Sequence, residues 1–311
     1  MIKYILKRIL QMIPAILITS LLIFVGMNLT SGDVARTILG DRASEEQLQA
    51  KRVELGLDKP IIVQYFNYMA KLCTGDLGKS YINGKDVFTE FQSRFPNTLE
   101  LAFTAILFAS IISIPLGIYT AMHQNTWQDT TGMVAALFGV SMPNFWLGLL
   151  LILLFSVKLG WLPSGGKSGI TSIILPAITV GLGQAAMIAR TTRSSMLDVV
   201  RQDYIRTARA KGCPEHKVIY KHALGNAMIP IITAVGLQLS NILTGSVLAE
   251  TVFSWPGIGR WIFDNISKRD TPMVTGGIIM CAIVMCIVNL LVDLVYAFFD
   301  PRIKAQYVKK G

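Results

Sequence analysis

Charged residues are scarce in this chain. Only 15% of its 311 residues are Asp, Glu, Lys or Arg, while 52% are apolar and the mean hydropathy is +0.51. A soluble domain carries about 25% charged residues, so the composition excludes a water-soluble protein of this size. It predicts an all-α integral membrane protein.

Cysteine and histidine are also rare, which bears on metal and redox chemistry. The chain has three histidines and four cysteines, at Cys73, Cys213, Cys281 and Cys286. The cysteines have neither metal-ligand spacing nor an obvious disulfide partner, so we interpret them as packing residues. The 13 scattered methionines are typical of helix packing rather than of copper binding. We therefore predict no metal site.

A phosphate-binding loop is missing as well. Such a loop needs the pattern G-x-x-x-x-G-K-[ST]. Two segments match the final Gly-Lys-Ser of this pattern, at Gly78–Ser80 and Gly166–Ser168. However, Cys73 and Trp161 occupy the position of the first glycine. The sequence therefore predicts no cofactor on this chain, no catalysis by it, and ATP with Mg²⁺ only on partner subunits if ATP drives it.

Acidic residues are few inside the apolar runs. Glu100 and Glu250 fall near the outer ends of predicted helices, and only Asp293 lies deep within one. A proton-coupled carrier needs a relay of such groups, so this class is disfavoured. We expect Asp293 to pair with a polar group of a neighbouring helix rather than to bind a solute.

What the chain has in abundance is long apolar runs. Runs of about 20 residues predict six membrane helices, at about 9–29, 97–122, 132–157, 173–189, 227–249 and 276–298. Prolines inside or beside these runs mark places where a helix can bend, at Pro14, Pro115, Pro143, Pro176 and Pro230. An even number of spans returns both termini to one side.

Positive charge indicates which side that is. The 190–226 segment carries eight Lys/Arg against three acids, and the tail after 298 carries four against one. The N-terminus is basic as well, whereas 30–96 has nine residues of each sign. Positive charge gathers on the cytoplasmic side. We predict a multi-pass protein of a prokaryotic cell membrane with both termini in the cytoplasm.

The first apolar run carries no signal-peptidase site, so we interpret it as a retained helix. The polar segment after it is predicted to fold as a small external cap. This gives two parts, a first helix with an external extension (1–96) and a five-helix core (97–311).

The 202–226 segment, QDYIRTARAKGCPEHKVIYKHALGN, has the pattern of two short helices with a glycine break. Tyr204, Ile205 and Ala208 are predicted on one helix face, opposite a basic face. Gly212 permits the turn, and Pro214 suits the start of the second helix. Such a basic hairpin between two apolar runs is suited to dock into another protein; we disfavour nucleic acid as its partner.

The spacing of this hairpin resembles the EAA loop of ABC importer permeases. The strings DYIRTARAKG and KHALGNAMIP closely resemble the first permease subunit of the dipeptide, oligopeptide and nickel branch, although Gly225 stands where that branch commonly has arginine. Further matches are SMPNFWLGLLLILLFSVKLGWLPSGG and the terminal DPRI. The hairpin residues assigned to ATPase coupling on this resemblance are Tyr204, Arg206, Thr207, Ala208, Arg209, Lys211, Gly212, His222 and Leu224.

The resemblance implies the type I importer fold and a set of partners. These are a homologous second permease, two cytoplasmic ABC ATPases and an extracytoplasmic solute-binding protein, all within membrane lipid. The cargo that the resemblance favours is a di- or oligopeptide. Nickel or another metal chelate and glutathione remain alternatives, with an ion-coupled secondary carrier as a more distant one.

Two groups of residues are predicted to meet the cargo or the binding protein. Gln238, Asn241 and Thr244 share one helix face and, with Gln184, could line a central path. The segment ETVFSWPGIG resembles a loop of the same branch that faces the binding protein, and we expect its aromatic residues to be exposed as an anchor or a contact. The residues assigned to this loop are Phe253, Trp255, Pro256, Gly257 and Arg260.

Overall fold

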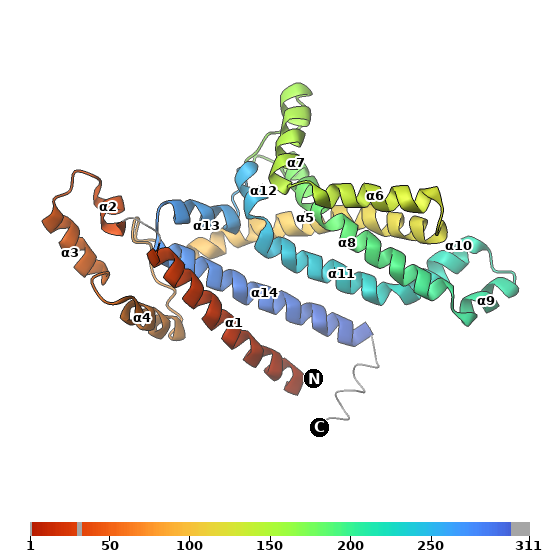
Figure 1. Ribbon diagram of the computed structural model, residues 1–311, viewed down its shortest axis with the longest axis horizontal. Coiled ribbons are helices and arrows are strands. Elements are labelled where there is room, and N and C mark those ends of the chain that lie inside the picture. The colour runs from red at the N-terminus through yellow and green to blue at the C-terminus, as the bar shows by residue number, and fades with distance from the viewer. Residues whose placement is uncertain (1, 30–32, 300–311) are drawn as a thin grey trace. The chain divides into compact units, whose positions relative to one another are not determined.

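The structure is a computed structural model, which describes the backbone of residues 2–29 and 33–299 (Figure 1). Side chains are described for 10–29, 33–243 and 246–292. These parts of the chain are helical, without a named strand. They form two compact units, the first from Met1–Thr98 with Pro256–Ile287 and the second from Leu99–Trp255 with Val288–Gly311. The division falls within the two long helices α5 and α14.

The first unit contains the N-terminal helix and the segment that follows it. Its elements are α1 (Ile2–Leu29), α2 (Val34–Leu39), α3 (Glu45–Leu55), α4 (Ile61–Cys73), α13 (Ile258–Ser267), the start of α5 (Val87–Met122) and most of α14 (Thr271–Phe299). Ser44 and Gln47 form a capping box that begins α3, and Gly56 ends it in a left-handed conformation.

The polar segment after α1 is folded, as predicted. The rings of Phe24 on α1 and Tyr65 on α4 lie 5.5 Å apart, and the Tyr65 hydroxyl lies 2.9 Å from that of Ser20. A second core joins α13 and α14 to the start of α5 through Trp261, Met273 and other buried apolar side chains.

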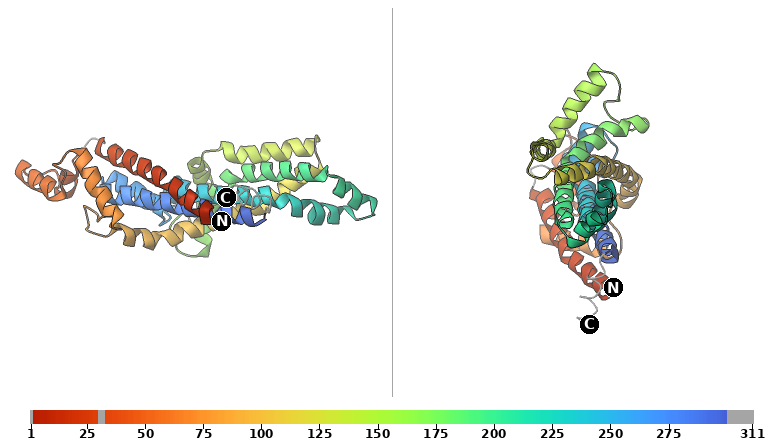
Figure 2. Two further views of the ribbon diagram at one scale, coloured as in Figure 1. Left: turned by 90° about the horizontal axis from the view of Figure 1, so that it is seen from below. Right: turned by 90° about the vertical axis from the view of Figure 1, so that its right-hand side faces the viewer.

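The second unit holds the remaining helices. They are α6 (Trp127–Ser141), α7 (Asn144–Leu151), a π-helix (Ile152–Lys158), a 3-10 turn (Ile170–Ile173), α8 (Ile174–Val200), α9 (Asp203–Ala210), α10 (Glu215–Lys217), a π-helix (Val218–Ala223), α11 (Leu224–Gly245) and α12 (Val247–Val252). Helix α8 is central, packed between α6 and α11 (Figure 2).

Small residues set the close packing of α8. A Cβ at Gly117 of α5 would lie 2.6 Å from the Ala189 carbonyl oxygen of α8, and one at Gly181 would lie 2.7 Å from the Ala105 carbonyl oxygen. The two backbones therefore approach to a distance that excludes any side chain larger than hydrogen.

Five described helices are long and apolar enough to span a membrane, or six if the bent pair at 127–158 counts as one span. The pair is bent by 96° between Ser141 and Asn144, at one of the prolines where the sequence predicts that a helix can bend. Pro143 sits in the break with its ring-fixed φ of −58° and begins α7. Two other boundaries shift outward, because α5 begins at Val87 and α8 continues to Val200.

Candidate functional site

The hairpin at 202–226 connects α8 to α11 and is our candidate site (Figure 1). The first short helix is present as α9, followed by a turn at Gly212 and a helix that begins after Pro214. The expected second short helix is not separate. Residues from Glu215 continue through the π-helix into α11, so that Glu215–Leu243 is one long helical stretch.

The turn depends on the backbone conformation of Gly212. Its φ is +78°, in the left-handed region that favours glycine, although a Cβ there would meet nothing within 4 Å. Across the turn, the Arg209 guanidinium donates to both carboxylate oxygens of Glu215, at 2.7 and 3.2 Å. This ion pair raises the pKa of Arg209, so the side chain stays charged and the two arms stay joined.

One side of the hairpin is anchored in the protein. Ile205, Val218 and Ala223 are fully buried in a cluster with Ile118 of α5 and Met196 of α8. Val218 and Ala223 share a face because a π-helix aligns residues five apart. A displacement of the hairpin must therefore be felt by α5, α8 and α11 together.

The other side of the hairpin is exposed and basic. Arg206, Thr207, Arg209 and Lys211 are exposed, while Ala208, His222 and Leu224 are half-buried. Tyr204 was predicted to share the apolar face with Ile205, but its side chain is 46% exposed. The structure thus places Tyr204 among the residues available to a partner.

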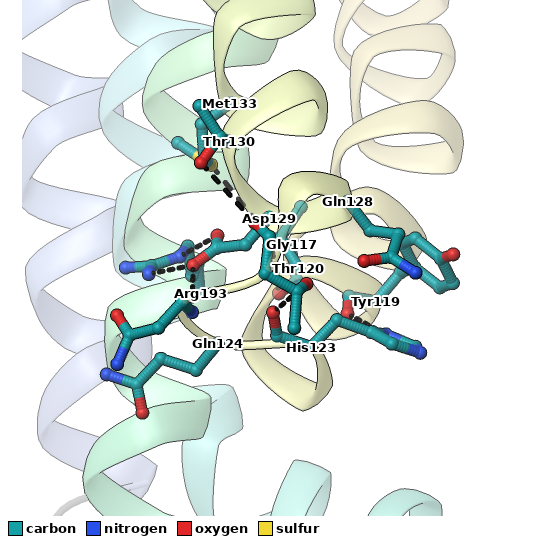
Figure 3. A network of polar contacts seen from close by, with 12 residues as sticks. Gly117, Tyr119, Thr120, His123, Gln124, Gln128, Asp129, Thr130, Met133 and Arg193 are labelled. Atoms are coloured by element: carbon teal, nitrogen blue, oxygen red, sulfur yellow. Dashed lines mark hydrogen bonds and ion pairs between the residues drawn. The ribbon is translucent and has the colours of Figure 1, made fainter.

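The structure shows a partly buried ion pair between α6 and α8 that the sequence did not reveal (Figure 3). Asp129 of α6 accepts from Nε and Nη2 of Arg193 of α8, each at 2.6 Å. The Asn125 backbone N–H, in the turn between α5 and α6, donates to the same carboxylate at 3.1 Å. This contact fastens the start of α6 to α8.

We overlooked this pair because both residues fell outside the predicted spans. The span was placed from 132 and the next one to 189, whereas α6 begins at Trp127 and α8 ends at Val200. One feature of the sequence could have indicated an earlier start of this helix. Asp129 is an acidic residue, and acidic residues favour the first turn of a helix.

The path-lining residues are only partly described. Gln238 is buried and Asn241 exposed on the same face of α11, and the Asn241 amide donates to the Gln238 side-chain oxygen at 2.8 Å. Gln184 is half-buried on α8. The side chains of Thr244 and Asp293 lie outside the described residues. A path along these residues stays a prediction.

The expected exposed aromatic loop is wrong. Phe253 and Trp255 are fully buried in the second unit, and Trp261 is 6% exposed in the first. The Gly166 backbone N–H donates to the Phe253 carbonyl at 2.8 Å, and Gly165 packs so closely there that a Cβ would lie 2.4 Å from that oxygen. These rings therefore serve as core and cannot be a membrane anchor.

The remaining residues of that loop differ in exposure. Pro256 is exposed, Gly257 is buried and Arg260 is half-buried. Contact of this loop with a binding protein stays a prediction.

The other residues considered from sequence have structural contacts. Glu250 is fully buried and accepts from the Ser246 hydroxyl at 3.1 Å. Glu100 pairs with Lys167, whose ammonium lies 5.5 Å from the centre of the Trp255 ring. Neither Gly-Lys-Ser segment lies between a strand and a helix in the described chain.

The division into parts 1–96 and 97–311 stays a prediction.

This chain is similar to known proteins along nearly its whole length. The family described as "Binding-protein-dependent transport system inner membrane component" matches residues 113–305, and its N-terminal companion family matches 1–102. The chain is 43% identical to the Dipeptide transport system permease protein DppB of Alkalihalophilus pseudofirmus, over 98% of this chain and 100% of that one. It is 42% identical to the Glutathione transport system permease protein GsiC of Escherichia coli K12, over 98% and 99%.

A solved structure shares the fold. A chain of the MetNI methionine ABC transporter, in an inward-facing conformation, superposes with a TM-score of 0.60 at 18% identity. The match covers 68% of this chain and 97% of that chain.

Proposed function

Since this chain belongs to the family of binding-protein-dependent transport system inner membrane components, we propose that it is a permease subunit of an ATP-driven importer of short peptides. The observation that carries this proposal is the 43% identity to a dipeptide permease over nearly the full length. Glutathione is the second candidate, supported by 42% identity to glutathione permeases over the same extent. Both cargoes are short peptides.

The chain itself is proposed to hydrolyse no ATP and to bind no cofactor. Its partners are a homologous second permease, two cytoplasmic ABC ATPases that carry Mg-ATP, and an extracytoplasmic binding protein that delivers the peptide. Both termini and the hairpin face the cytoplasm in this arrangement, supported by the eight basic residues of 190–226 against three acids.

The hairpin is proposed as the element that couples ATP binding to transport. Its exposed residues, Tyr204, Arg206 and Lys211 among them, would contact an ATPase. Its buried residue Ile205 packs against α5, α8 and α11 through one cluster. Closure of the ATPase dimer would displace the hairpin, and this cluster would carry the displacement to the helices that open and close the path.

The cargo is tested with the complex reconstituted in lipid together with its binding protein. We measure ATPase stimulation and uptake with di- to pentapeptides, glutathione and nickel-chelator complexes. Stimulation by peptides with matching uptake supports the proposal and gives the length range. Stimulation by glutathione alone selects the second candidate, and a response to metal complexes alone contradicts both. Uptake that persists without ATP would show a different class of transporter.

The coupling role is tested at Gly212. Because a Cβ there meets open space, the cost of Gly212→Val is about 1 kcal/mol or more of backbone strain in a left-handed turn. We expect this variant to insert into the membrane but to lose uptake relative to ATP hydrolysis. Gly212→Asn is the matched control, because asparagine tolerates the left-handed region. Equal uptake by both variants would argue against coupling through this turn.

A further inference from the structure

The first unit contains a cavity of about 860 Å³ that no step of the proposed transport cycle uses. Its walls are the end of α3, the turn that follows, one face of α4, the 76–84 segment and the first turns of α14. The volume lies within the range of about 300–1,000 Å³ that is usual for small-molecule sites. The polar path residues on α8 and α11 belong to the second unit, whereas the residues that line this cavity belong to the first.

Its lining carries an excess of positive charge. Four lysines, Lys51, Lys59, Lys71 and Lys79, stand against only two acids, Glu54 and Asp76. Lys51 pairs with Glu54 at 2.7 Å, whereas the other three lysines make no ion pair with any side chain that the structure describes. A cavity lined mostly by one sign of charge concentrates ions of the opposite sign.

Two buried hydroxyl groups without a hydrogen-bond partner among the described residues belong to side chains of this lining. They belong to Tyr68 of α4 and to Thr275 of α14, and the Thr275 side chain is only 1% exposed. A buried hydroxyl that lacks a partner costs stability, so such groups call for a specific explanation. Hydrogen bonding to a bound molecule supplies one.

The wall around these hydroxyls is fixed. Asp270, just before α14, accepts from the Ser80 hydroxyl and, at 3.1 Å, from the Tyr81 backbone N–H. These contacts fasten the 76–84 segment to the start of α14. Because the Asp270 carboxylate already occupies that helix N-terminus, an incoming anion must be held by the lysines instead.

We propose that this cavity is a second solute site that binds a carboxylate-bearing molecule of di- to tripeptide size. The lysines hold the carboxylate, and the hydroxyls of Tyr68 and Thr275 hydrogen-bond to amide or other neutral polar groups of the same molecule. The choice of a peptide among small carboxylates rests on the proposed function. The existence of the site and its preference for an acid do not depend on the proposed function.

The test measures equilibrium binding to the assembled transporter in phosphatidylcholine nanodiscs, with neither ATP nor the binding protein present. The probes are glycyl-leucine, its C-terminal amide and glutathione. Calorimetry measures the affinity of each. We expect the free acid to bind and the amide to bind more weakly. Because no ATP is used, a failure here is independent of a failure to import peptides.

Variants distinguish this cavity from the central path. Thr275→Val should weaken glycyl-leucine binding about tenfold, as expected for the loss of one hydrogen bond at the upper end of the usual range. Lys71→Met and Lys79→Met should each weaken it about threefold. Lys268→Met is the matched control, since Lys268 is an exposed lysine of the same unit outside the cavity and should leave the affinity unchanged.

Thermal unfolding without ligand separates binding from a structural role. Thr275→Val keeps the shape of the side chain and removes an unpartnered hydroxyl, so its midpoint should stay the same or rise while the affinity falls. Binding that is unchanged in Thr275→Val and Lys79→Met, or equal for acid and amide, would overturn the proposal. So would loss of peptide binding when phosphatidylglycerol is added to the nanodiscs, because the site would then belong to a lipid headgroup.

Discussion

At the scale of single residues, the pair of Asp129 and Arg193 is the most informative contact. The carboxylate is nearly buried, with 8% of its side chain exposed, and both of its oxygens accept from the guanidinium. Removal of one partner leaves the other charge without compensation in a poorly hydrated place. The pair therefore makes the position of α6 on α8 depend on two side chains that are 64 residues apart in sequence.

We expect Asp129→Asn to destabilise the protein by about 2 kcal/mol, because hydrogen bonds to a charged group are lost and Arg193 keeps its charge. The measurement is thermal unfolding followed by tryptophan fluorescence. Asp203→Asn is the control, since its ion pair with Arg206 is 3.8 Å long and exposed, and it should have almost no effect. A double variant, Asp129→Leu with Arg193→Met, should cost less than the two single changes added together. Strict additivity would contradict the coupling.

A second residue-scale prediction concerns pH and the segment after α1. Asp33 begins α2, and its carboxylate accepts from Nη2 and Nε of Arg52 on α3, at 2.6 and 3.1 Å. The Arg52 guanidinium holds the pKa of Asp33 below its ordinary value of 3.8. A lowered pKa in the folded state stabilises the fold above 3.8, and this contribution is lost as the pH falls through the folded value.

Opening of α2 and α3 should therefore increase as the pH falls from about 5 to 3, by less than about 1 kcal/mol because the pair is partly exposed. Hydrogen exchange of the α2 and α3 amides, corrected for intrinsic rates, measures it. Asp33→Asn should show a smaller pH dependence, because it removes the carboxylate whose pKa the Arg52 guanidinium lowers. The same dependence in both proteins would exclude Asp33 as its source.

At the scale of elements, close approach of helices decides the packing of the second unit. Gly117 brings α5 against α8, and a Cβ there would overlap both the Ala189 carbonyl and the Thr192 side chain. Neither neighbour can move without shifting the backbone of α8. Glycine is therefore required at this position by space rather than by backbone conformation.

We predict that Gly117→Val destabilises the protein by about 1–3 kcal/mol through overpacking. Gly225→Ala is the matched control. It also replaces a glycine of a long helix, but a Cβ at Gly225 meets nothing within 4 Å, and alanine should be neutral or stabilising by up to about 1 kcal/mol. Thermal unfolding midpoints of the two variants provide the comparison. A larger loss for Gly225→Ala would refute the packing argument.

At the scale of the whole molecule, the number of membrane spans decides where the C-terminus lies. Five described helices qualify singly, and the pair at 127–158 qualifies only as one bent span. Six spans place both termini on the same side, whereas five place them on opposite sides.

With six spans, a fluorescent protein fused after Gly311 should mature and fluoresce in the cytoplasm, while alkaline phosphatase fused there should be inactive. Alkaline phosphatase inserted beside Lys59, in the segment after α1, should be active. An active phosphatase at the C-terminus would show that the bent pair does not cross the membrane, and it would contradict the predicted topology.

Properties that depend on composition and on neighbours in the chain were predictable. Apolar runs long enough to cross a bilayer predicted membrane helices, and Gly212 between two helical patterns predicted a turn. Both are local constraints. The strings DYIRTARAKG and KHALGNAMIP indicated the permease family, which the full-length similarity confirms. Two predictions for the hairpin were wrong. Tyr204 is 46% exposed instead of lying on the apolar face, and the second helix is not separate, because Glu215 begins a stretch that continues through a π-helix into α11.

Burial and long-range pairing were decided only by the tertiary structure. An aromatic segment beside a Pro-Gly turn has the same sequence whether its rings face solvent or fill a core, and Phe253 and Trp255 fill a core because Gly165 and the helices of the second unit close over them. The contact of Asp129 with Arg193 and the cavity lined by Tyr68 and Thr275 likewise join segments far apart in the chain. The sequence by itself determined the membrane location, the family and the hairpin, because these follow from local pattern. Which side chains meet depends on how the helices pack, which no local pattern specifies.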